Sequence, residues 1–163
     1  MRGKYLAVFL ALAAFAAVAT AQTKLSGVVN CKKPDPMQSI DLDDAKGHMM
    51  TLGKSMCTWT KGFEVAGSSA KEGYSVASSE VNGNKATVRG VHITTLASGD
   101  KVHVRFQGTG TSKDGKPESD TGTWSFTGGT GKAKGLKGKG TYDGKPQADG
   151  STIYQIEGEY SLP

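Results

Sequence analysis

The apolar residues of this chain occur in short runs that alternate with polar residues, and this pattern limits the fold more than any other feature. From residue 25 onward the runs are bounded by Gly, Asn-Gly, Asp-Gly and Ser-Gly. Because apolar residues never recur at helical spacing over three turns, the pattern predicts an all-β protein. The predicted strands cover residues 24–30, 38–43, 48–60, 74–82, 86–96, 101–111, 119–127, 136–143 and 151–160.

Eight or nine short strands can close into a barrel or pack as a sandwich. The predicted strands follow one another through tight turns, and closure removes the two exposed edges of such a meander. An antiparallel up-and-down barrel of about eight strands is therefore the favoured fold, and a β-sandwich is the alternative. A length of 163 residues suits one domain, which we expect over residues 22–163.

Residues 1–21 have the pattern of a signal peptide. They begin with Arg2 and Lys4, continue with an apolar run, and end in the small-x-small sequence of residues 19–21. We expect cleavage before Gln22, which gives a secreted or periplasmic protein without a membrane anchor. The two positive charges lost on cleavage leave a net charge of +3, which is too small to indicate a nucleic-acid partner.

The chain has two cysteines, Cys31 and Cys57. In an oxidising compartment two such thiols are expected to pair, so we predict one disulfide. A zinc site needs more ligands than two cysteines supply, and neither cysteine belongs to a C-x-x-C redox motif.

The hairpin around residues 97–100 can be predicted at the level of single residues. A two-residue turn there would set Val91 opposite Phe106 and Ile93 opposite Val104 on one face. A slip of one residue would scatter this apolar set, so the clean separation supports the predicted register.

The next turn lies at residues 113–116, Lys-Asp-Gly-Lys, a strong type I′ signal. Direct pairing through it would place Trp124 and Phe126 on the polar face. A bulge at Gly108 or Gly110 would return both aromatic residues to the apolar face, and we favour the bulge because large aromatic side chains usually belong to the core.

The segment 128–140 alternates Gly with Lys but matches neither the Walker motif nor the dinucleotide-binding fingerprint. The favoured interpretation is structural: glycines at alternate positions let aromatic side chains lie over the backbone while the lysines point to water. A lysine ridge that binds anions is the alternative.

Residues 57–60, Cys-Thr-Trp-Thr, and 122–131, which carry Gly-x-Trp-x-Phe-x-Gly-Gly-Thr-Gly, resemble a group of small exported bacterial proteins of unassigned function. The likeness continues through the Lys/Gly-rich strand at 137–142, and these proteins are similar to the allene oxide cyclase and dirigent barrels. The resemblance implies an eight-stranded antiparallel barrel with a central cavity, and a homo-oligomer. The catalytic carboxylate and water-holding asparagine of the cyclase have no matching position here, so no activity is carried over.

The candidate ligand-binding residues follow from the polar face of the first hairpin. If that face points into the barrel, His92, His103 and Arg105 line a polar cavity, which Trp124 joins if no bulge intervenes and which Glu157 or Gln155 completes. Arg105 would then pair with a carboxylate or phosphate, and Trp124 would stack on a ring or on Arg105. The favoured interpretation, however, places His92, His103 and Arg105 on the solvated outer face of the barrel.

No catalytic residue, metal site or cofactor is predicted. The chain lacks the G-x-S-x-G motif of hydrolases, and its three histidines, at 48, 92 and 103, offer no set of converging metal ligands.

These observations favour a noncatalytic barrel that binds a small hydrophobic or amphipathic ligand, or a partner surface. The alternative is a cofactor-independent, cyclase-like or dirigent-like enzyme that acts inside the barrel. A buried carboxylate with a perturbed pKa, such as Glu80 or Glu157, would favour the enzyme. A third hypothesis, a lectin or cell-surface binder, requires Trp59 or Trp124 on the outside.

Overall fold

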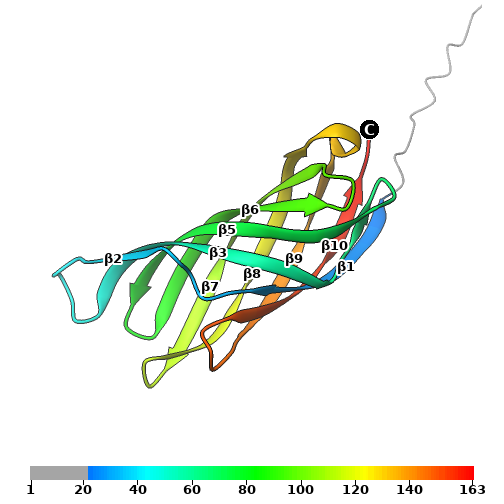
Figure 1. The fold of residues 1–163 in the computed structure, drawn as a ribbon. Helices are drawn as coiled ribbons and strands as arrows, with labels where there is room; N and C mark the ends of the chain where they lie inside the picture. The colour runs from blue at the N-terminus through cyan, green and yellow to red at the C-terminus, as the bar shows by residue number, and fades with distance from the viewer. Residues whose placement is uncertain (1–21) are drawn as a thin grey trace, which may run out of the picture.

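The computed structural model describes residues 22–163, which form a closed antiparallel barrel (Figure 1). The predicted signal peptide at residues 1–21 lies outside the described residues. Pairing of β3 with both β1 and β5 closes the barrel in the order β3-β1-β10-β9-β8-β7-β6-β5, so the barrel prediction is confirmed and the sandwich is wrong. The eight barrel strands are β1 (Thr23–Cys31), β3 (His48–Lys61), β5 (Ser68–Asn82), β6 (Lys85–Leu96), β7 (Lys101–Lys113), β8 (Lys116–Gly129), β9 (Lys137–Pro146) and β10 (Thr152–Ser161).

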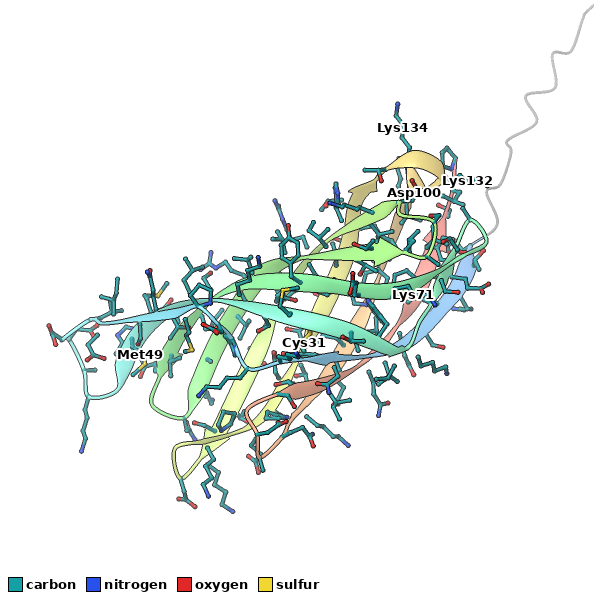
Figure 2. The ribbon with its side chains drawn as sticks, in the orientation of Figure 1. Cys31, Met49, Lys71, Asp100, Lys132 and Lys134 are labelled. Atoms are coloured by element: carbon teal, nitrogen blue, oxygen red, sulfur yellow. A yellow bond between two sulfur atoms is a disulfide. The ribbon has the colours of Figure 1, made fainter. Side chains whose placement is uncertain are left out.

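Three short elements complete the fold. Strand β2 (Met37–Asp41) pairs with the first half of β3, and β4 (Glu64–Val65) pairs with the start of β5. The 3-10 helix η1 (Gly131–Ala133) lies at the end of the barrel where the chain terminates (Figure 1). Figure 2 places Met49 on the β2–β3 hairpin, which projects at the other end. None of the helices in the described part of the chain could span a membrane.

The β6–β7 hairpin has a three-residue loop instead of the predicted two-residue turn. The Gly99 N–H donates to the Leu96 carbonyl at 2.9 Å, and the Leu96 N–H donates to the Asp100 carbonyl at 2.8 Å. Gly99 adopts a left-handed conformation with φ of 87°, as the last residue of such a loop requires. The extra loop residue moves the register of the whole hairpin by one.

The predicted partners across this hairpin were therefore wrong. Gly90, not Val91, lies opposite Phe106, and His92, not Ile93, lies opposite Val104. His92 consequently shares the inner face of the barrel with Val104 and Phe106.

The β7–β8 hairpin contains the predicted kind of bulge at a different place. The register shifts between Thr111 and Ser112, close to the turn, and not at Gly108 or Gly110. The consequence for the aromatic residues is as predicted, because Trp124 pairs with Phe106 and faces the core.

Apolar side chains fill one end of the barrel. β4 and η1 cover this end, and Val65, Val102 and Ala133 there are completely buried. The opposite end, where the long hairpins project, has no comparable cluster among the described residues. We call these the closed end and the open end.

The predicted disulfide is confirmed. Cys31 and Cys57 lie directly opposite each other on β1 and β3 and are bonded, with a sequence separation of 26. On the chain-entropy model, a disulfide that closes a loop of this length raises the free energy of unfolding by about 3 kcal/mol, because it restricts the unfolded chain.

Alternating glycines let aromatic rings lie over the backbone of β9, as predicted. A Cβ atom added to Gly140 would lie 2.7 Å from Cζ2 of Trp124, and one added to Gly138 would lie 2.9 Å from Cδ2 of Phe126. Lys139, between these glycines, and Lys137, just before them, are exposed. These glycines therefore make room for the aromatic lining of the barrel.

Candidate functional site: the cavity inside the barrel

The barrel interior holds a cavity of about 240 Å³. Its walls are mostly apolar and aromatic. Apart from the two tyrosines, the side chains with a hydroxyl, carboxyl or imidazole among the described lining residues are Ser55, Ser75, Ser79, His92 and Asp120. The aromatic lining residues are Trp59, Phe63, Phe106, Trp124, Phe126, Tyr142 and Tyr154. An apolar cavity with a few converging polar groups is the usual form of a small-molecule site.

Asp120 and two tyrosines form the first polar group. The Tyr142 hydroxyl donates to Oδ1 of Asp120 at 3.1 Å, and the Tyr154 hydroxyl donates to Oδ2 at 3.0 Å. Burial raises the pKa of the Asp120 carboxyl, while the two tyrosine hydrogen bonds act in the opposite direction. Burial, followed by the neighbouring carboxylate, raises the pKa of both tyrosines, so they stay protonated donors.

The local sequence explains how these three residues meet. Asp120 on β8, Gly144 on β9 and Tyr154 on β10 are direct partners across three adjacent strands. A Cβ atom on residue 144 would lie 2.5 Å from Cε1 of Tyr154. Because Gly144 has no side chain, the Tyr154 ring can cross β9 and reach the carboxylate.

His92 and Ser75 form the second polar group. Nδ1 of His92 and Oγ of Ser75 are 2.8 Å apart on the paired strands β6 and β5. His92 is 8% exposed, and its Nε2 atom has no hydrogen-bond partner among the described residues. Burial lowers the pKa of His92 to about 4, so the imidazole is neutral at physiological pH.

The two polar groups lie at different heights in the barrel. Asp120 pairs with Gly110 of β7, and Gly110 pairs with Ala86 of β6, so this row of paired residues crosses β6 six residues before His92. A molecule in the cavity can therefore meet a carboxyl group and a neutral imidazole at separate positions. Both groups can accept or donate a proton or a hydrogen bond.

The structure separates the five predicted ligand-binding residues. His92 and Trp124 face the interior, whereas His103, Arg105 and Glu157 lie on the outer face of the sheet. The prediction that His92 shares a face with His103 and Arg105 was wrong, because it relied on the two-residue turn.

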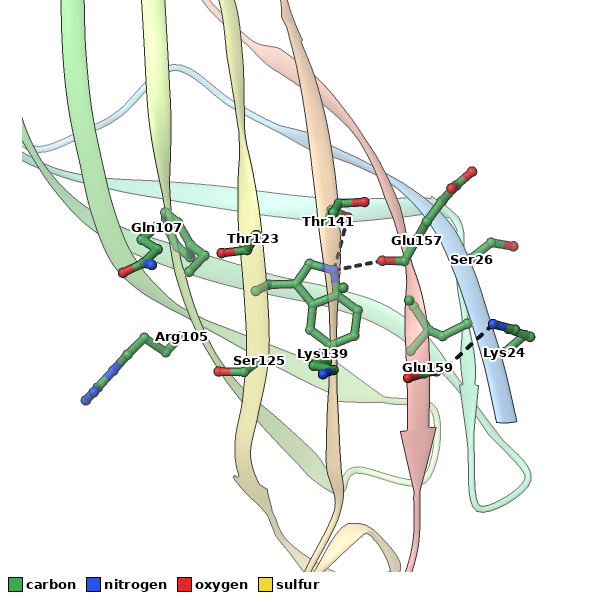
Figure 3. A pocket seen from close by; sticks show the side chains of 15 residues that line it. Lys24, Ser26, Arg105, Gln107, Thr123, Ser125, Lys139, Thr141, Glu157 and Glu159 are labelled. Atoms are coloured by element: carbon green, nitrogen blue, oxygen red, sulfur yellow. Dashed lines mark hydrogen bonds and ion pairs between the residues drawn. The ribbon is translucent and has the colours of Figure 1, made fainter. Parts of the chain in front are cut away.

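Arg105 and Glu157 belong to a groove on the outside of the barrel (Figure 3). They lie on β7 and β10, and the ion pair in this groove joins Lys24 and Glu159 at 3.5 Å. Trp124 lies behind the groove, where its indole N–H donates to the carbonyl oxygens of Thr141 and Glu157 at 3.1 and 3.2 Å. A ligand-binding role for these residues stays a prediction.

Sequence reasoning missed Asp120, Tyr142, Tyr154 and Ser75. A usable signal was present for Asp120, because it lies at an even spacing from Trp124 and therefore on the same face of β8. Neither Glu80 nor Glu157, the carboxylates proposed from the sequence, lines the cavity.

Two other hypotheses receive no support from the geometry. Trp124 is 6% exposed and Trp59 lines the cavity, so neither forms an exposed sugar-binding surface. Within residues 22–163, no group of three or more His, Cys, Asp or Glu side chains is arranged to hold a metal ion.

Comparison with known proteins supports the fold. No protein-family model and no curated protein matches the chain. The pterocarpan synthase dirigent protein GePTS1 is similar in structure, with a TM-score of 0.50 and 12% identity over 87% of this chain and 92% of that one. The chain has a dirigent-like fold.

Two further solved structures are similar at low identity. One is "Pyocyanin demethylase", with 17% identity over 85% of this chain and 99% of that one and a TM-score of 0.41. The other is a protein of unknown function from the DUF3224 family of Shewanella oneidensis MR-1, with 15% identity over 88% and 100% of the two chains and a TM-score of 0.48.

Proposed function

We propose that this protein is an exported barrel that binds a small, largely apolar molecule in its interior cavity. The observation that carries the proposal is the cavity of about 240 Å³, whose aromatic walls hold a carboxyl group and a neutral imidazole. Transfer of apolar ligand surface from water to such walls provides the affinity, and the two polar groups provide orientation.

Export is supported by two features. The disulfide between Cys31 and Cys57 is of the kind that persists in oxidising compartments. The sequence pattern of residues 1–21 is typical of a signal peptide.

A variant with a filled cavity tests the proposal. Ala77 on β5 lines the cavity, whereas the neighbouring Ser78 faces the other side of the strand. We expect indole, a small neutral probe, to bind the wild-type protein and the Ser78→Phe control in ligand-observed NMR. Ala77→Phe should bind at least about tenfold more weakly, because its ring takes the place of the ligand. Equal binding by both variants would place the site outside the barrel.

A second function is favoured by one observation, the raised pKa of Asp120 beside two tyrosine donors. Such a carboxyl group can act as a general acid or base, as a cofactor-independent enzyme inside the barrel requires. Incubation with a metabolite extract of the native compartment separates the two functions. An enzyme would deplete one mass and produce another, and Asp120→Asn would not, whereas a binding protein would leave both unchanged.

A further inference from the structure

Asp120 is a carboxylate without a cationic partner among the described residues, 22–163. The ion pairs found among residues 22–163 do not include it, and none of the described residues lining the cavity is Lys or Arg. Its two oxygens each accept one tyrosine hydrogen bond and keep a further lone pair free.

A partly buried negative charge of this kind is costly unless it is compensated. Hydroxyl donors offset part of the lost hydration, and a positive charge offsets much more. Burial raises the pKa of Asp120 although two hydrogen bonds lower it, so the site lacks a compensating charge. No side chain among residues 22–163 supplies such a charge, so where Asp120 is ionised a compensating cation would come from outside the chain.

Aromatic rings surround the position that such a cation would occupy. The Tyr142 ring lies 5.8 Å from the Tyr154 ring and 6.1 Å from the Phe106 ring, in edge-to-face contacts. All three rings line the cavity beside Asp120. Aromatic faces attract cations through their quadrupole, most strongly where water is excluded.

A metal ion does not suit this environment. Ca²⁺ and Mg²⁺ take six or more oxygen ligands, whereas Asp120 is the only carboxylate among the described residues that line the cavity. An organic cation fits better, because its apolar body can occupy the rest of the aromatic cavity.

We infer that the cavity takes an organic cation, an ammonium group or positively charged nitrogen heterocycle with an apolar body, whose charged nitrogen lies beside Asp120 and against the aromatic rings that line the cavity there. This inference rests on the proposed binding function and names its ligand class.

Two probes of the same shape test the inference. Phenyltrimethylammonium carries the positive charge, and tert-butylbenzene is its neutral counterpart. We expect the wild-type protein to bind the cation at least about tenfold more tightly at pH 7. Asp120→Asn should abolish this preference, and Asp143→Asn, on the exposed face of the neighbouring strand, should keep it.

A second measurement applies if Asp120→Asn does not fold. The side-chain carbon of Asp120 in the wild-type protein is titrated by NMR with and without each probe. Phenyltrimethylammonium should shift the titration of Asp120 to lower pH, because a bound cation favours the carboxylate, and tert-butylbenzene should not.

The outcomes separate the two levels of the proposal. If both probes bind equally and the Asp120 titration is unchanged, the cation inference is overturned while small-molecule binding stands. If indole binds and phenyltrimethylammonium does not, the cation inference is likewise overturned and small-molecule binding stands. If neither probe nor indole binds, the proposed function fails together with the inference.

Discussion

His92 is the residue whose chemistry depends most on where the fold places it. With a pKa of about 4 in the folded protein and about 6.5 when unfolded, it takes up its proton more readily in the unfolded chain. The free energy of unfolding should therefore fall as the pH drops from about 6.5 to about 4, by about 3 kcal/mol from this residue. Urea unfolding across this pH range should show the fall in the free energy of unfolding for the wild-type protein and a smaller fall for His92→Gln.

His103→Gln serves as the control for this measurement, because His103 lies on the outer face of the adjacent strand. Asp120 changes the free energy of unfolding with pH in the opposite direction. Its pKa is raised in the folded state, so its protonation stabilises the fold as the pH falls through that pKa. Only the difference between His92→Gln and wild type isolates the imidazole. If the free energy of unfolding of His92→Gln falls with pH as steeply as that of the wild-type protein, the buried histidine is not the cause of the fall.

At the level of strands, the row of residues around Asp120 shows how glycines shape the cavity. Gly110 and Gly144 flank Asp120 on its two sides. A Cβ atom on Gly144 would collide with the Tyr154 ring, whereas one on Gly110 would meet Ser119 and Ala86 at ordinary distances of 3.4 and 3.6 Å.

We therefore expect Gly144→Ala to lower the free energy of unfolding by about 1–3 kcal/mol, because the Tyr154 ring must move away from Asp120. Gly110→Ala should change it by less than about 0.5 kcal/mol. Chemical denaturation of the two variants provides the comparison. Similar losses in both would mean that the glycines serve the backbone and not the ring.

The strands themselves could be predicted from the sequence because their signals are local. Alternation and turn residues located nine of them. The two missed parts, β4 and the start of β5, lie in a stretch where alternation extends over only three residues before a run of small and polar residues. The register of the strands was harder to predict than their positions. One additional residue in the loop before Asp100 turned His92 to the inner face and Val91 to the outer face. The type of turn can therefore override a register that the apolar pattern supports.

At the scale of the whole molecule, the site could not be predicted because it is assembled from distant strands. Asp120, Tyr142 and Tyr154 meet only after three strands pair in the correct register. Trp124 was correctly assigned to the interior, since the preference of large aromatic residues for the core does not depend on detailed geometry. Arg105 and Glu157 went to the outer face, where charged side chains stay hydrated.

The proposed function requires that the barrel holds a small molecule in its interior cavity. Native mass spectrometry of the protein purified from its own compartment, with the intact mass compared with the denatured mass, shows whether it does. We expect a retained cationic small molecule in the wild-type protein that is lost in Ala77→Phe and kept in Ser78→Phe. A protein that is empty at its disulfide-bonded mass and also fails to take up indole would rule out a binding cavity.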